Sequence, residues 1–262
     1  MFSLNLEGKT ALVAGSTQGI GFASAAELAS MGASCVLIAR NEAALKEAIA
    51  NLDVSRGQHH KYLVADFSST DQVQSVVAAF TAENTVHILV NNSGGPAAGP
   101  IAEAQPDQFL AAFNQHLICN HIITRLVMPG MKAAGFGRII NIISTSVKIP
   151  LKNLGVSNTI RGAVASWAKT MANELAPFGI TVNNVLPGAT ATARLEGIIS
   201  NKVNKTGVSA EEVEKEMLEE IPAKRFGKPE EIAAVVAFLA SPAAAYVNGT
   251  SIPVDGGRTG SI

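Results

Sequence analysis

The sequence predicts an α/β protein: one doubly wound domain in which helices cover both faces of a parallel β-sheet. Short apolar segments alternate with helical patterns along all 262 residues, without a repeat, a linker or a low-complexity stretch. The apolar segments are continuous, which is typical of strands buried on both faces. The first of them leads directly into a glycine-rich turn and a helix. These three features together favour a sheet enclosed between two layers of helices.

Seven segments are predicted as strands because each is short, apolar and bounded by turn residues or by a helical pattern. Gly15 closes the first, Asp66 follows the third and Ser144 closes the fifth. In chain order the predicted strands are 10–15, 34–40, 62–65, 86–92, 137–144, 180–188 and 251–257.

Helices are predicted between these strands from alanine-rich and periodic patterns. Asn41 is expected to cap the second helix, and Thr70 or Asp71 to start the third. Gly227 and Pro229 interrupt the chain before the last helix. The predicted helices are 19–31, 41–51, one from residue 70, a long one up to 134, 158–176 and one up to 240.

The stretch 194–231 differs from the rest of the chain in composition. Charged residues concentrate there and the helices are short, with Ser209 predicted as an N-cap. We expect a lid-like helical insertion within a single domain that comprises residues 1–262. The insertion leaves the carboxyl end of a predicted strand, where ligands bind in open α/β sheets.

Composition excludes several classes of protein. The net charge is −1, from 20 basic and 21 acidic residues, which argues against a nucleic-acid-binding surface. Cys35 and Cys119 lie far apart, so neither a disulfide framework nor a metal site is expected. The most apolar run, 232–247, is too short to cross a membrane, and the first residues do not resemble a secretory signal. We therefore expect a cytoplasmic protein without nucleic-acid or membrane partners.

The turn after the first predicted strand has the spacing GxxxGxG. Gly15 permits a tight turn, Gly19 lets the backbone approach a pyrophosphate, and Gly21 allows the strand and helix to pack closely. The helix N-terminus adds amide donors and the positive end of its dipole. The alternative is an ordinary strand-to-helix turn. The expected dinucleotide-binding turn comprises Gly15, Ser16, Thr17, Gln18, Gly19, Ile20 and Gly21.

Four motifs occur together along the chain: the glycine turn, Asn-Asn-Ser-Gly at 91–94, Pro-Gly at 187–188 and Val-Asp-Gly-Gly at 254–257. In this order and spacing they resemble the short-chain dehydrogenase/reductase family, and most closely its 3-oxoacyl-(acyl-carrier-protein) reductases. The resemblance implies a Rossmann sheet of seven strands in the order 3-2-1-4-5-6-7, an NAD(P) cofactor and a carbonyl or alcohol substrate. It also implies a homotetramer or homodimer, formed by helices 109–134 and 158–176.

The resemblance assigns cofactor contacts to the strand ends. Arg40 stands near the position where NAD-preferring relatives carry an acidic residue, so NADP(H) is favoured because a guanidinium suits a 2′-phosphate. A solvated charge is the alternative for Arg40, and a helix-capping role for Asp66. The remaining assigned cofactor contacts are Asp66, Phe67, Asn91, Ser93, Gly94, Pro187, Gly188 and Thr192. Asn91 and Thr192 also have simpler interpretations, as a turn former and a surface residue.

The sequence departs from the family pattern at the catalytic residues. Relatives use an asparagine, a serine, a tyrosine and a lysine; here counting from the flanking motifs gives His116, Ser144, Ser157 and Arg161, so only the serine is retained. Serine is a far weaker acid than tyrosine. Arg161 cannot give up its proton, but it can bind the cofactor's ribose and supply charge near a developing alkoxide.

Two residues remain as candidates for the proton donor. His116 titrates near neutrality in an ordinary environment. Lys148 follows Ser144 in the loop after the fifth strand, and burial there would lower the pKa of its amine. Lys148 is favoured over His116; a structural histidine and a solvated lysine are the alternatives. Two functions follow: an NADP(H)-dependent oxidoreductase with a non-standard proton-donating site, or a dinucleotide-binding relative with little or no catalysis.

Overall fold

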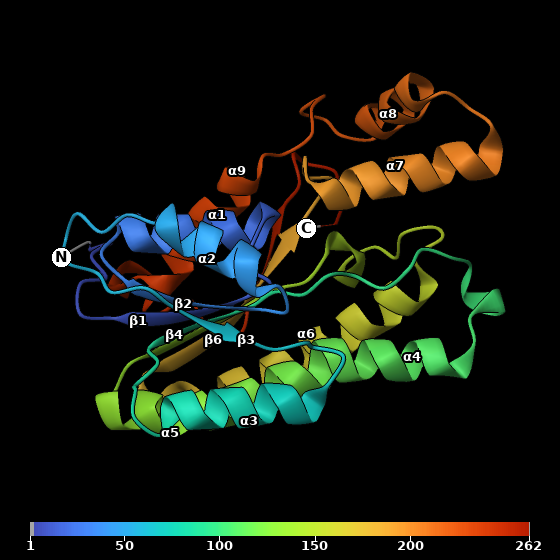
Figure 1. The fold of residues 1–262 in the computed structure, drawn as a ribbon. Coiled ribbons are helices and arrows are strands. Elements are labelled where there is room, and N and C mark those ends of the chain that lie inside the picture. The colour runs from blue at the N-terminus through green and yellow to red at the C-terminus, as the bar shows by residue number, and fades with distance from the viewer. Residues whose placement is uncertain (1–2, 262) are drawn as a thin grey trace.

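The structure is a computed structural model that describes residues 3–261. Seven parallel strands form one sheet in the order β3-β2-β1-β4-β5-β6-β7, which confirms the predicted fold class and strand order (Figure 1). Each strand lies within a predicted segment or starts one residue earlier. The strands are β1 (Thr10–Ala14), β2 (Ser34–Ala39), β3 (Lys61–Val64), β4 (Ile88–Asn91), β5 (Gly137–Ile142), β6 (Ile180–Pro187) and β7 (Ser251–Val254).

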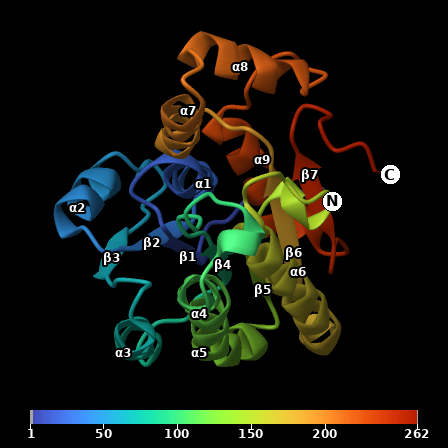
Figure 2. The same cartoon turned by 90° about the vertical axis from the view of Figure 1, so that its right-hand side faces the viewer.

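Helices cover the two faces of the sheet (Figure 2). On one face α1 packs against α9, and on the other α3 packs against α5, with α6 beside β6. Each face has its own cluster of buried aliphatic side chains, so the strands are enclosed on both sides as their continuous apolar pattern predicts. The helices are α1 (Gly19–Ser30), α2 (Glu42–Ala50), α3 (Thr70–Thr81), α4 (Pro106–Phe113), α5 (Cys119–Ala134), α6 (Gly155–Leu175), α7 (Ala193–Thr206), α8 (Ala210–Glu219) and α9 (Pro229–Ala240).

A row of buried polar side chains crosses four strands of the sheet. The Asn91 amide donates to Asn141 Oδ1 at 2.9 Å, and the Asn141 amide donates to Asn184 Oδ1 at 3.0 Å. The Asn184 amide then donates to Ser251 Oγ at 3.0 Å. The three bonds follow the strand register, in which these residues are direct neighbours. Since a shift by one residue would leave buried amides unpaired, this ladder favours a single register.

Two helices differ from their predicted extents. The predicted long helix is divided, because a π-helical turn at Asn114–Ile118 separates α4 from α5. α6 begins three residues earlier than predicted, at Gly155. A Cβ at Gly155 would lie 2.4 Å from the Cβ of Ile101, so a glycine is needed where the helix starts beside this chain segment.

The charged stretch after β6 forms the two helices α7 and α8, which extend beyond the sheet (Figure 1). Ser209 caps α8 as predicted, its Oγ accepting from the Glu212 amide. Leu195, Ile199 and Val213 form a small core between the two helices. We call α7 and α8 the lid. Backbone hydrogen bonds between residues 189–191 and Gly227 close its base. Among residues 3–261 no helix is long and apolar enough to cross a bilayer.

Candidate active site

A cleft of about 1780 Å³ lies at the carboxyl ends of the central strands and continues under the lid. It is lined by the turn after β1, the ends of β2 and β3, the loops after β4, β5 and β6, and one side of α7. Seven cationic side chains line it against three carboxylates, so the cleft favours an anionic ligand.

The glycine turn after β1 depends on two left-handed backbone conformations and one close approach of the backbone. Gly15 and Gly19 have φ values of +58° and +56°, a region that L side chains rarely adopt. A Cβ at Gly21 would lie 2.1 Å from the Gly15 carbonyl oxygen, so only glycine lets α1 pack this closely on the strand. The turn therefore needs glycine at all three positions.

The start of α1 is open to a ligand. Gln18 is the N-cap residue, and its side chain makes no capping hydrogen bond, so the first amides of the helix are not satisfied by the cap. Thr17, Gln18, Gly19 and Ile20 line the cleft, whereas Ser16 is buried and does not. Free amides and a positive dipole end fit the pyrophosphate of a dinucleotide.

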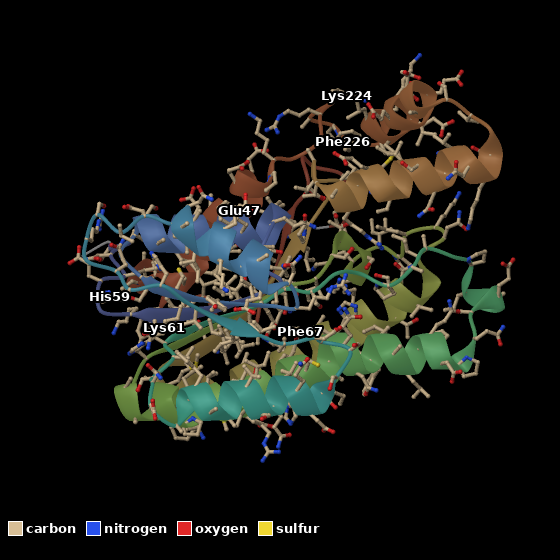
Figure 3. The ribbon with its side chains drawn as sticks, in the orientation of Figure 1. Glu47, His59, Lys61, Phe67, Lys224 and Phe226 are labelled. Atoms are coloured by element: carbon tan, nitrogen blue, oxygen red, sulfur yellow. The ribbon has the colours of Figure 1, made fainter. Side chains whose placement is uncertain are left out.

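The ends of β2 and β3 form the next part of the cleft. Arg40 is exposed there, and Glu42, the acidic residue nearest in sequence, bonds instead to Tyr62 and Lys46. The Ser68 amide donates to the Asp66 carboxylate, which holds the pKa of Asp66 below its usual value. Figure 3 shows Phe67 just past one end of β3 and Lys61 at the other end, and Phe67 packs into the core on the α3 and α5 side of the sheet. Asp66 thus caps a turn and also borders the cleft, so both of its interpretations are compatible with the structure.

Asn91, at the end of β4, was expected to contact the cofactor, but it does not line the cleft. Asn91 bonds to Asn141 within the sheet and does not line the cleft, whereas Asn92, Ser93 and Gly94 do. The Asn92 amide donates to the Gly15 carbonyl at 3.0 Å and so connects the β4 loop to the glycine turn. Sequence reasoning did not single out Asn92, although it belongs to the same Asn-Asn-Ser-Gly motif.

The loop after β6 faces the glycine turn across the cleft. Pro187, Gly188 and Thr192 all line it, and the Thr192 methyl would lie 3.4 Å from a Cβ on Gly19. Gly188 is closely packed, since a Cβ there would be 2.7 Å from the Asp255 backbone. Thr192 is the N-cap residue of α7, so the same turn borders the cleft and begins the lid.

Ser144, Ser157 and Arg161 line the cleft together, although they come from different segments. Ser144 follows β5, and its Oγ accepts from the Ser146 amide at 3.1 Å, which leaves the hydroxyl proton free to donate. Ser157 and Arg161 are one turn apart on α6. Arg161 is only 8% exposed, and its Nη1 donates to the Ile142 carbonyl at 3.1 Å. Burial lowers the pKa of Arg161 to about 10, and nearby Arg194 lowers it too.

His116 does not have the environment that titration near neutrality requires. It lies in the π-helical turn, is 1% exposed, and its Nδ1 is 2.6 Å from Ser93 Oγ. Burial lowers the pKa of His116 to about 3, with further contributions from Arg161 and Arg194. The imidazole is therefore neutral at pH 7, and the expectation that it titrates near neutrality is wrong.

The structure does not bring Lys148 into the site. Its side chain is exposed and does not line the cleft, so the burial expected for Lys148 is not found and its amine is not placed to donate the proton. A short 3-10 helix, Thr145–Val147, turns the chain after Ser144 and places Lys148 at its end. Sequence reasoning instead missed Arg194, which lines the cleft and donates to the Pro96 carbonyl at 2.6 Å. Arg194 follows Thr192, an expected cofactor contact, by two residues, and this proximity in sequence could have identified it as a residue of the cleft.

Known proteins share both the sequence and this fold. A family model described as enoyl-(acyl carrier protein) reductase matches residues 14–259. The 3-oxoacyl-(acyl-carrier-protein) reductase of Vibrio cholerae is 34% identical over 257 residues, which cover 97% of this chain and 98% of that protein. The chain belongs to the short-chain dehydrogenase/reductase family.

Two further members of the family are named as reductases that use or bind NADPH. An NADPH-dependent reductase of Bacillus subtilis is 31% identical over 256 residues, 97% of this chain and 99% of that protein. L-sorbose reductase from Gluconobacter frateurii, solved in complex with NADPH and L-sorbose, superposes with a TM-score of 0.92 at 30% identity. That comparison covers 99% of this chain and 100% of the other.

The low pKa of His116 predicts how stability depends on pH. Below pH 6.5 the unfolded chain takes up a proton at His116 that the folded chain refuses, so stability is full above that pH and falls as the pH decreases toward 3. The free energy of unfolding should fall by up to about 1.4 kcal/mol per pH unit from this group alone. Denaturant titrations between pH 4 and 8 should show a shallower fall for His116→Gln. The exposed His59→Gln is the control, and equal slopes in all three proteins would contradict the prediction.

Proposed function

We propose that the chain is an NADP(H)-dependent oxidoreductase of the short-chain dehydrogenase/reductase type that acts on a carbonyl or alcohol group. The observation that carries the proposal is one continuous cleft, which joins the glycine turn at Gly19 to Ser144 and Arg161. The bound nicotinamide supplies or accepts the hydride. NADPH in the names of two relatives supports the same cofactor.

The chain's own residues act on the oxygen of the substrate. The Ser144 hydroxyl, oriented by the Ser146 amide, donates to that oxygen. The Arg161 guanidinium stabilises the negative charge that develops there. Ser157 stands where relatives carry a tyrosine, and its smaller side chain leaves space for water. We propose that a water molecule relays the proton, giving one to the substrate oxygen as it takes one from bulk solvent, since Arg161 keeps its proton and His116 is already neutral.

A second candidate function is a dinucleotide-binding protein with little or no catalysis. Both tyrosines of the chain lie away from the cleft. Tyr62 lies on β3 and bonds to Glu42, and Tyr246 is fully exposed. No phenol is therefore available to the site. This candidate differs from the first in one respect, because it binds NADPH and does not oxidise it.

Single-turnover oxidation of NADPH over a panel of carbonyl compounds tests the proposal. We expect turnover with at least one compound, and Ser144→Ala should lower its rate at least about tenfold because one oxyanion donor is lost. NADPH affinity should change little, and Ser157→Ala should slow the reaction less. Turnover by no compound, with NADPH still bound, would favour the second candidate.

The cofactor preference depends on Arg40 at the end of β2. NADPH should bind more tightly than NADH, and Arg40→Asp should reverse the order because a carboxylate repels the 2′-phosphate and accepts from the 2′-hydroxyl. Both affinities can be measured by adding each cofactor to the protein in steps and recording the change in protein fluorescence. Arg56→Asp makes the same charge change outside the cleft and should leave the order unchanged. Equal affinities in the unsubstituted protein would remove the role of Arg40.

We also propose that the chain forms a homotetramer or a homodimer through α4, α5 and α6. Leu110 and Phe113 are exposed apolar side chains on α4, a surface that pairing of copies would cover. Sedimentation velocity should show the assembled species at micromolar concentration. A monomer under these conditions would contradict the proposal.

A further inference from the structure

Arg161 is a buried cation without an ionic partner in the part of the chain that the structure describes. Among residues 3–261 the five ion pairs include neither Arg161 nor Arg194. Within that range the Arg161 guanidinium donates one hydrogen bond, to the Ile142 carbonyl, and the residue lines the cleft. A buried charge is costly unless it is paired. The pairing group must therefore come from a ligand.

A second guanidinium converges on the same place from the lid. A Cβ on Gly95 would lie 3.2 Å from Arg194 Nη2 and 3.6 Å from Arg161 Nη2, so both groups border the same point beside the β4 loop. Arg161 comes from α6 and Arg194 from the first turn of α7. Because Gly95 has no side chain, both guanidinium groups have room beside this loop.

A third observation at this place is the buried His116. Its Nε2 has no hydrogen-bond partner among the described residues, and its pKa is lowered by both arginines. His116 does not itself line the cleft, and within residues 3–261 the hydrogen bonds of these three side chains go to Ser93, the Ile142 carbonyl and the Pro96 carbonyl, with no carboxylate among them. The three carboxylates that line the cleft are placed elsewhere: Asp66 caps the Ser68 amide, Glu220 pairs with Arg258, and Glu103 is exposed at the rim.

We propose that Arg161 and Arg194 bind a carboxylate of the substrate, so that this protein acts on an oxo acid whose carboxylate lies close to the reacting carbonyl. The inference rests on the proposed function and adds the class of substrate. A planar guanidinium matches a carboxylate in two parallel hydrogen bonds. Arg161 lies one turn after Ser157, so the anion is held at the reacting end of the cleft.

The cofactor's phosphates are the other source of an anion, and the geometry argues against them. The pyrophosphate cradle lies at Gly19, where the nearest neighbour of an added side chain is Thr192 and not an arginine. Arg40 lies at the end of β2, separate from both cationic groups. An anion beside Gly95 is therefore additional to the phosphates that the glycine turn and Arg40 accommodate.

Calorimetry with oxamate, an unreactive 2-oxo acid mimic, tests the inference on the full chain saturated with NADP⁺. Oxamate should bind, and its neutral analogue oxamide should bind at least about tenfold more weakly, because a charge-assisted hydrogen bond is lost. Arg194→Gln should weaken oxamate binding by a similar factor. Arg194→Lys should weaken it less, since lysine keeps the positive charge but cannot form the two parallel hydrogen bonds of a guanidinium. Lys205→Gln is the matched control: it removes a charge from the same side of α7 and should retain oxamate binding.

The outcomes separate the inference from the proposed function. If Arg194→Gln weakens NADPH binding and the unsubstituted protein does not bind oxamate, the arginines bind the cofactor and the inference is overturned. Equal binding of oxamate and oxamide overturns it as well. If NADPH does not bind but the cofactor-free protein still prefers oxamate to oxamide, the carboxylate site stands and the proposed function fails.

Discussion

The segment that follows β4 contacts the glycine turn, the π-helical turn and the lid, and so connects the cofactor end of the cleft to its substrate end. The Asn92 amide fixes the glycine turn by donating to the Gly15 carbonyl, and the next residue, Ser93, contacts His116. Gly95 leaves space for the two arginines, and the Pro96 carbonyl accepts from Arg194. Four residues of this short segment thus contact or border the β1 turn, the π-helical turn, α6 and the lid. A change of backbone path here would alter the cofactor cradle and the substrate end together.

The fold was predictable from local patterns, because parallel strands buried on both faces must be apolar throughout and the helices between them must be periodic. Those patterns do not determine the order of the strands, which only the family resemblance implied. The glycine turn was predictable for a steric reason that is visible in the sequence, since only glycine tolerates the approach of Gly21 to the Gly15 carbonyl. The π-helical turn at 114–118 was not predicted, because it is a local change in the backbone hydrogen-bond pattern and not a change in residue type.

The candidate site was less predictable, because its chemistry depends on which way side chains face. Asn91 and Asn92 are adjacent in one motif, yet the first completes a ladder inside the sheet and the second borders the cleft. Lys148 follows Ser144 closely in sequence, but the short 3-10 helix between them leaves it exposed. His116 occupies the position expected from counting, and only its burial shows that it is neutral.

The site is arranged at a cost in stability, which connects its structure to its function. Within residues 3–261 the buried Arg161 has no ion-pair partner and the buried His116 imidazole has a nitrogen without a hydrogen bond, and both features destabilise the folded chain. In the amide ladder from Asn91 to Ser251 each asparagine amide donates one hydrogen bond to the next strand, so the ladder can keep these strands in register despite that cost. A ligand that supplies negative charge at Arg161 removes the penalty as it binds. Part of the binding free energy then comes from removing this unfavourable burial of charge. That contribution depends on the charge of the ligand, so the site selects for anions independently of the shape of the substrate.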